Sequence, residues 1–126
     1  VAKKIKFIEH CKEMPLAYSL ADVVVSASIE PEAFGRVSVE AQSMGKPIIA
    51  SNIGGSKETV LNKKSGFLYK HDDPRELAKS LNTVIQMSSD ELKKMSNEGK
   101  KNITKKFNVE TMCESNLKEY RKLIKI

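Results

Sequence analysis

The sequence predicts an α/β fold in which a parallel sheet is covered by helices on both faces. Two observations favour this class. Short apolar runs alternate with amphipathic stretches through residue 87, which is typical of right-handed strand–helix–strand crossovers. The runs at 23–25 and 47–51 consist almost wholly of apolar residues, and a strand without a polar face is typical of a sheet buried from both sides. We therefore expect a Rossmann-like, three-layer α/β/α domain.

Four strands are expected. The short apolar run at 6–8 predicts the first. Residues 23–25 are three successive valines, a β-branched run that favours a central strand. The remaining strands are expected at 47–51 and 66–69, the latter beginning at Gly66.

Capping residues and apolar spacing predict six helices. Pro15 suits the first turn of one helix and Gly45 ends the next. Asp73 and Ser88 each stand three positions before a Glu, which is the pattern of a capping box. The expected helices cover 14–21, 37–44, 57–61, 74–87, 90–106 and, after an Asn108 cap, 109–125. The apolar positions that should face inward are Leu16, Ala17, Leu20 and Ala21 in the first, and Leu77, Leu81, Val84 and Ile85 in the fourth.

Composition excludes several classes of protein. The 126 residues fit one domain, and no apolar run approaches the ~20 residues of a membrane-spanning helix. Of the net charge of +6, residues 90–126 carry +4, with ten basic and six acidic side chains. Their lysine pairs predict either a solvated helical face or contact with phosphates or anionic lipid. Because aromatic residues are few and Trp is absent, no nucleic-acid partner is expected.

The metal-binding residue types are sparse. Cys11 and Cys113 lie far apart, and neither His10 nor His71 has a neighbour at ligand spacing. We therefore expect no metal site, and reduced thiols in a cytosolic protein.

The loop at 26–35 is the strongest candidate site. It follows an expected parallel strand, and ligands bind at the carboxyl ends of such strands. Gly35 lets the backbone approach a ligand closely. The N–H groups of Arg36, Val37 and Ser38 would then point at an anion at the N-terminus of the following helix.

Two carboxylates flank this cradle. Glu32 lies in the loop and Glu40 in the helix, with seven residues between them. A carboxylate near the start of the helix can accept two hydrogen bonds from a vicinal diol such as that of ribose. The alternative is that both are ordinary surface charges.

Several motifs in one order resemble a known family. They are Glu32 to Ala41 with Phe34-Gly35 inside, Gly45-Lys46-Pro47 before a strand, Gly54-Gly55-x-x-Glu58, Ser65-Gly66-Phe67-Leu68, Asp73-Pro74-x-x-Leu77-Ala78 and Lys106-Phe107. Over residues ~5–125 the chain resembles the C-terminal, donor-binding half of a family 4 retaining glycosyltransferase of the GT-B fold (glycosyl transferases group 1). Ala33 and Glu9 stand where the family often has Gly.

The resemblance implies roles for particular residues. Glu40 would bind the donor ribose, and Glu32 would lie near the donor sugar as the catalytic carboxylate. The remaining donor-binding residues implied are Phe34, Gly35 and Arg36 at the sugar hydroxyls, Val37 and Ser38 at the pyrophosphate, Gly54 and Gly55 at the cleft, and His10 at the base. A hexosyl unit would pass from a nucleotide-diphosphate sugar to a glycan or lipid-linked acceptor with retention and without a metal or other cofactor.

The resemblance also implies that residues 1–126 form a single C-terminal nucleotide-sugar-binding domain, a fragment without the acceptor-binding N-terminal domain. The family's basic pair for the pyrophosphate lies upstream as well, so the fragment alone should be inactive. The full-length protein would act in cell-envelope polysaccharide biosynthesis, in the cytoplasm or peripherally at the inner membrane face. The alternative is a non-catalytic nucleotide-sugar-binding module or a degenerate truncated transferase.

Overall fold

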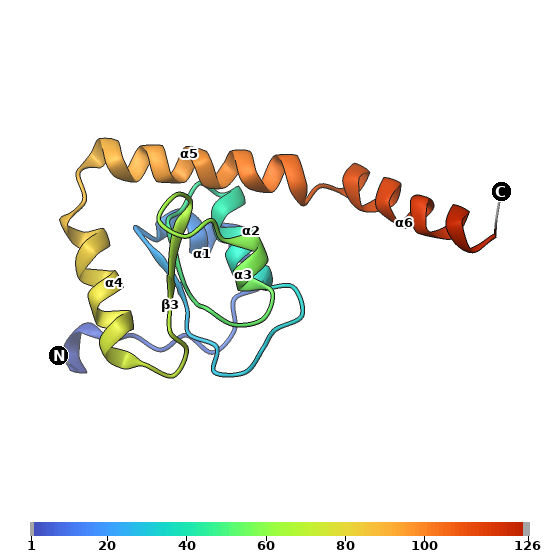
Figure 1. Ribbon diagram of the computed structural model, residues 1–126. Coiled ribbons are helices and arrows are strands. Elements are labelled where there is room, and N and C mark those ends of the chain that lie inside the picture. Colours follow the sequence, from blue (N-terminus) through green and yellow to red (C-terminus); the bar gives the residue numbers. More distant parts are fainter. Residues whose placement is uncertain (1, 125–126) are drawn as a thin grey trace.

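A computed structural model of the protein describes residues 2–124 (Figure 1). Its centre is a three-stranded parallel sheet of β1 (Val24–Ser26), β2 (Ile48–Ser51) and β3 (Gly66–Tyr69), in the order β1-β2-β3. Val24 is paired with Ile48, and Ile48 with Gly66. The expected strands at 47–51 and 66–69 are confirmed.

Helices cover both faces of the sheet. On one face, α1 (Met14–Leu20) and α2 (Arg36–Ser43) enclose a core cluster of Tyr18, Ala41, Ile48, Ala50 and Val60, with α3 (Ser56–Thr59) beside them. On the other face, α4 (Pro74–Gln86) closes a second cluster of Ile49, Tyr69 and Val84. This confirms the predicted three-layer α/β/α fold.

The last two helices lie outside these layers. The helix α5 (Ser89–Lys106) runs across one end of the domain and packs on α2, whereas α6 (Val109–Leu123) extends away from it (Figure 1). A short 3-10 helix, η1 (Ala2–Lys4), begins the described chain. Within residues 2–124, no helix is long and apolar enough to cross a membrane.

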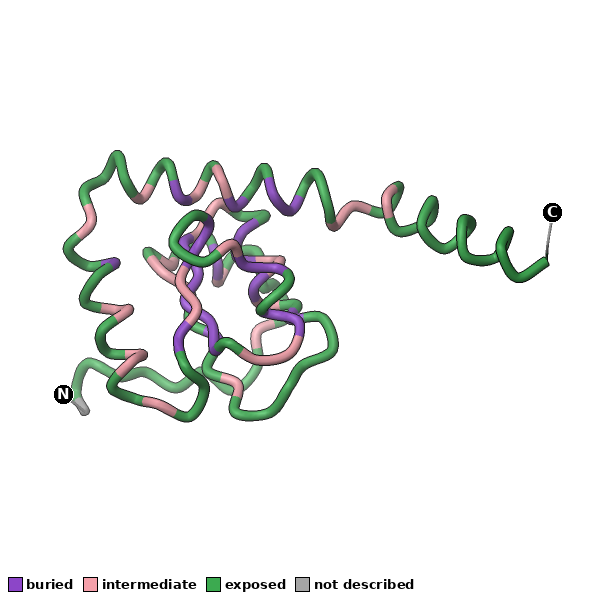
Figure 2. Tube along the Cα trace, in the orientation of Figure 1, coloured by how far each residue is buried: buried purple, intermediate pink, exposed green. Residues whose placement is uncertain are grey.

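The second strand explains why the sequence shows apolar runs without a polar face. All four residues of β2 are buried, and Figure 2 shows buried residues, in purple, gathered at the centre of the domain. Successive side chains of a strand point to opposite faces. Ile48 and Ala50 accordingly enter one core cluster and Ile49 the other.

Two strand predictions are wrong. Residues 6–8 form no strand, and Phe7 is 93% exposed. An apolar run of three residues becomes a strand only through backbone pairing, and no backbone hydrogen bond joins this segment to β1. Residues 24–26 do form a strand, but it lies at one edge of the described sheet, and Val25 is exposed. The central strand is β2, because it has a neighbour on each side.

The helix caps are largely as predicted. The Asp73 carboxylate accepts from the N–H groups of Arg75 and Glu76, and Ser88 and Glu91 form a complete capping box. The Asn108 side chain accepts from Thr111 N–H at 2.7 Å. The box at Asp73 is incomplete, because within residues 2–124 the Glu76 carboxylate accepts no hydrogen bond from the Asp73 N–H. The expected end of the last helix at 125 lies outside the described residues.

Helix faces were predicted less well than caps. In α1 the expected Leu16 and Leu20 are exposed, and Tyr18 is the buried residue. In α4, Val84 is buried as expected, but Ile85 is exposed. The third helix is shorter than predicted, because Thr59 is its last residue.

Candidate functional site

The N-terminus of α2 is the centre of the candidate site. Gly35 precedes the helix in the left-handed conformation, with φ 76° and ψ 54°, which favours glycine. Its carbonyl accepts from Ser38 N–H at 3.0 Å and from Val39 N–H at 3.3 Å. The Ser38 N–H is therefore not free for an anion, contrary to expectation, because the first turn tightens onto Gly35. In the described chain the N–H groups of Arg36 and Val37 have no acceptor.

The Gly54-Gly55 turn packs directly under the loop that carries Glu32. Gly55 N–H donates to the Glu32 carbonyl at 2.8 Å. A Cβ on Gly54 would lie 2.5 Å from the Glu32 carbonyl oxygen, and a Cβ on Gly55 would lie 2.4 Å from the Phe34 carbonyl carbon. Both glycines thus allow a close approach of two backbone segments, and they bring the loops at 32–34 and 54–55 together.

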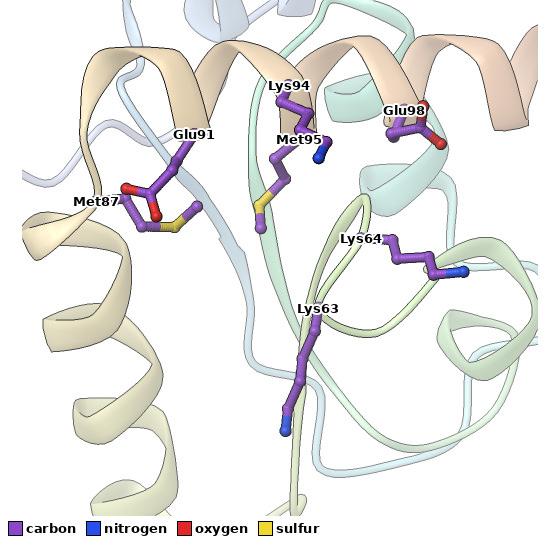
Figure 3. Close-up of a pocket in the computed structure, with 7 residues that line it drawn as sticks. All are labelled: Lys63, Lys64, Met87, Glu91, Lys94, Met95 and Glu98. Atoms are coloured by element: carbon purple, nitrogen blue, oxygen red, sulfur yellow. The ribbon is translucent and has the colours of Figure 1, made fainter.

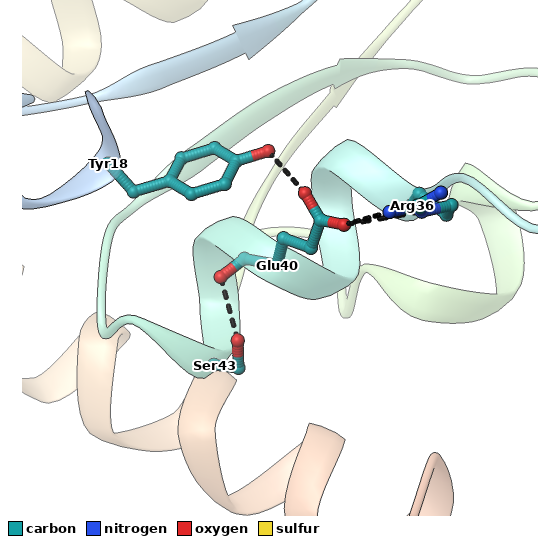
Figure 4. A network of polar contacts seen from close by, with 4 residues as sticks. All are labelled: Tyr18, Arg36, Glu40 and Ser43. Carbon is teal, nitrogen blue, oxygen red and sulfur yellow. Dashed lines mark hydrogen bonds and ion pairs between the residues drawn. The ribbon is translucent and has the colours of Figure 1, made fainter. Parts of the chain in front are cut away.

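The two predicted carboxylates have different surroundings. Glu32 is exposed, and its Oε1 accepts a hydrogen bond from the Ser28 hydroxyl. Glu40 is partly buried, and Figure 4 shows its carboxylate between two partners. Its Oε1 accepts from Arg36 Nη2 at 2.9 Å and Nε at 3.2 Å, and its Oε2 accepts from the Tyr18 hydroxyl at 2.8 Å. Glu40 is thus not an isolated surface charge, because both of its carboxylate oxygens accept hydrogen bonds from other side chains.

Tyr18 is a site residue that sequence reasoning missed. It is buried in the core cluster that Ile48 and Ala50 share, and only its hydroxyl reaches the site. Burial, and then the hydrogen bond and charge of Glu40, raise the pKa of Tyr18 to about 12. The hydroxyl therefore stays protonated and donates. The only sequence signal was a large amphipathic residue within the apolar helix at 14–21.

The Phe34 side chain packs against an aromatic residue at the end of α5. Its ring meets that of Phe107 edge to face, with centroids 5.8 Å apart and planes at 63°. The two rings and Met112 of α6 line an apolar hollow of 330 Å³. The Phe34 ring is thus engaged on one side by Phe107, although it remains 46% exposed.

A set of buried amides, here called the amide clip, fixes α2 against its neighbours. The Thr59 carbonyl accepts from Gln42 Nε2 at 2.9 Å and from Asn102 Nδ2 at 3.1 Å. Gln42 Nε2 also donates to the Ser38 carbonyl at 2.9 Å. The clip joins α2, α3 and α5, and so holds the glycine turn in place relative to α2. Sequence reasoning did not identify it.

His10 lines a pocket that none of the other predicted site residues lines. It lines a hollow of 620 Å³ between the segment at 8–11 and α1, together with Met14 and Leu20. No hydrogen bond in residues 2–124 joins it to Glu32 or Glu40. A further hollow of 420 Å³ opens between α5 and the loop before β3, and Figure 3 shows its seven lining residues, which include Lys63, Lys94 and Glu98 but none of the predicted site residues.

Among the described residues, no three His, Cys, Asp or Glu side chains are grouped so that they could hold a metal ion. Both cysteines, Cys11 and Cys113, are free thiols.

A parallel sheet between two helix layers, with a glycine-capped helix N-terminus after its first strand, defines a Rossmann-like α/β domain. Residues 1–102 match the family of glycosyl transferases group 1. The chain belongs to this family.

Solved structures of glycosyltransferases show the same fold. A glycosyltransferase from Rickettsia africae superposes with a TM-score of 0.89 at 33% identity, over 97% of this chain and 32% of that one. Alr3699/HepE from Anabaena in complex with UDP superposes with a TM-score of 0.88 at 29% identity, over 96% of this chain and 33% of that one. The fold is therefore that of one part of the GT-B glycosyltransferases.

Among sequence relatives, spore coat protein SA of Bacillus subtilis is 29% identical over 119 residues, which are 94% of this chain and 31% of the relative. The chain thus spans about a third of the length of these three relatives.

Proposed function

We propose that this chain binds the donor of a retaining glycosyltransferase, a nucleoside diphosphate sugar. The observation that carries the proposal is the start of α2, where two free N–H groups, those of Arg36 and Val37, precede the Glu40 carboxylate on one helix. A helix N-terminus favours a phosphate, and a carboxylate nearby suits a ribose diol. The complex of Alr3699/HepE with UDP supports this choice of ligand.

Each part of the site then has a role toward the donor. The pyrophosphate lies at the Arg36 and Val37 N–H groups, and Glu40 accepts both ribose hydroxyls. The exposed Glu32 carboxylate faces the donor sugar as the catalytic group, beside the backbone of Phe34 and Gly35. Ser38 supports the first turn of α2 rather than meeting the phosphate, and Gly54 and Gly55 hold the Glu32 loop. His10 reaches the base from the segment before α1.

The departing diphosphate would be stabilised by the N-terminal dipole of α2 in place of a metal ion. Fixed dipoles aimed at developing charge are an established source of catalysis in sites from which water is excluded. Retention at the anomeric carbon is part of this proposal.

We place the chain in a larger protein whose other domain binds a glycan or lipid-linked acceptor. Without that domain, the chain alone is inactive. The chain spans about a third of the spore coat relative and of Alr3699/HepE, which supports this, and the spore coat relative supports work on the cell envelope. The basic excess in 90–126 supports peripheral contact with an anionic membrane surface from the cytoplasm.

UDP titration followed by NMR tests the donor site. We expect shifts at the Arg36 and Val37 amides, and about tenfold weaker binding after Glu40→Gln. Glutamine is preferable to alanine because its amide oxygen can still accept from the Tyr18 hydroxyl. A change in UDP binding would then reflect loss of the charge and not loss of this packing contact. Glu76→Gln, on the opposite helix layer and also in an ion pair within its own helix, is the matched control and should bind like wild type.

Two outcomes would contradict the proposal. One is that neither UDP, GDP nor ADP binds. The other is that the shifts gather around the 420 Å³ hollow. Transfer of sugar by the complete gene product separates an enzyme from the alternative, a nucleotide-sugar-binding module without catalysis.

A further inference from the structure

The Glu40 carboxylate is held from two sides that differ in rigidity. Arg36 approaches from the solvent, and its side chain is 82% exposed. Exposed ion pairs between residues four apart on a helix stabilise little and exchange readily with water. Tyr18 approaches from the core, and it is only 5% exposed. Of the two partners, only Tyr18 can give the carboxylate a fixed position.

The Tyr18 ring has little freedom. It packs in the cluster with Ala41, Ile48, Ala50 and Val60, and side chains in close-packed cores remain in one rotamer on average. Its hydroxyl is therefore presented to Glu40 Oε2 at 2.8 Å from one direction (Figure 4).

The hydrogen bond leaves the carboxylate able to bind a diol. Each carboxylate oxygen has about two acceptor positions, so Oε2 can accept from Tyr18 and from a ribose hydroxyl together. Oε1 becomes fully available when Arg36 turns into solvent. Tyr18 orients the group without occupying the positions that the ligand needs.

We propose that Tyr18 is a positioning residue that holds the Glu40 carboxylate for bidentate recognition of the ribose diol, an inference that rests on the proposed function. Through this residue α1 and the core set the selectivity for ribonucleoside diphosphates over their 2′-deoxy counterparts. The raised pKa of Tyr18, about 12, agrees with a hydroxyl that donates throughout the physiological pH range.

The test compares UDP with 2′-deoxyuridine diphosphate on the Tyr18→Phe variant, which loses one hydroxyl and keeps the ring in the core. We expect UDP to bind about three- to tenfold more weakly, whereas 2′-deoxyuridine diphosphate, which lacks half of the diol, changes by less than about twofold. Tyr69→Phe is the matched control. Tyr69 is also 5% exposed, on the other face of the sheet, and this variant should bind both ligands like wild type.

A second variant asks whether Tyr18 acts through Glu40. In a Glu40→Gln background, Tyr18→Phe should weaken UDP binding by a smaller factor than in wild type, since the charge that it positions is gone. Equal weakening of both nucleotides by Tyr18→Phe, or no weakening, would overturn the positioning role while leaving the donor site intact. If the wild-type chain binds neither nucleotide, the proposed function and the positioning role both fall.

Discussion

Replacing Gly55 by alanine should separate the two loops of the candidate site. The backbone at Gly55, φ −62° and ψ −21°, is open to any residue, so alanine brings no torsional strain. Only its Cβ matters. That atom would lie 2.4 Å from the Phe34 carbonyl carbon and 2.5 Å from its oxygen, whereas ordinary contact begins at 3.4 Å. The segments must therefore move apart by about 1 Å.

The cost follows from what this movement breaks. Overpacking of this kind costs about 1–3 kcal/mol, and loss of the hydrogen bond from Gly55 N–H to the Glu32 carbonyl adds about 1 kcal/mol. For a chain of this size, the midpoint of thermal unfolding should fall by roughly 10 °C. UDP binding should weaken too, because the Glu32 loop no longer lies against the start of α2.

Circular dichroism melting and UDP titration together measure both effects. Gly99→Ala is the control, since Gly99 is also buried but its Cβ would meet only the Gln42 side chain, at 3.2 Å. The helix gains about 1 kcal/mol from alanine, which offsets this contact, so a small change in either direction is expected. A Gly55→Ala protein that melts and binds like wild type would refute the steric reasoning.

Two further predictions concern the capping box and the aromatic pair. The Ser88 N–H and hydroxyl lower the pKa of Glu91; the stabilisation is therefore complete above its ordinary pKa of 4.5 and is lost as the pH falls through the lowered value. In urea denaturation, wild type should lose more stability than Glu91→Gln between about pH 6 and about pH 3, and equal losses would contradict this. Phe107→Ala should lower the free energy of unfolding by about 1–2 kcal/mol and shift the ring resonances of Phe34. Phe107→Leu should lose only part of this, and unmoved Phe34 resonances would argue against the contact.

Features set by neighbouring residues were predictable from the sequence. Asp73, Ser88 and Asn108 accept from backbone N–H groups within three positions, so their caps depend on local chemistry alone. The buried strand at 48–51 followed from an apolar run without a polar face. The segment at 6–8 failed because a strand depends on a partner that no local pattern specifies. Periodicity likewise predicted which residues of α1 and α4 share one apolar face. It could not predict whether another element packs on that face, and Leu20 and Ile85 are exposed.

In the candidate site, too, local features were predictable from the sequence and long-range contacts were not. Gly35 was expected to let the backbone approach a ligand, and Gly54 and Gly55 to face the cleft. That the two backbone segments pack directly against each other was not predicted. The occupied N–H of Ser38 was not predictable, because tightening of a first helical turn depends on the cap geometry. Tyr18 and the amide clip join residues far apart in the sequence, and a single sequence carries no signal of such pairs.

The amide clip has a consequence for the order of folding. Asn102 and Thr59 are 43 positions apart, so the loops at 32–34 and 54–55 gain their final support only after most of the chain has been synthesised. Contacts of such long range form late, because the entropy of closing the intervening chain is lost first. A nascent chain that ends before α5 would carry every proposed donor-binding residue and yet leave the Thr59 carbonyl without its Asn102 donor. Maturation of the candidate site is thereby coupled to completion of a helix that contributes no proposed ligand contact.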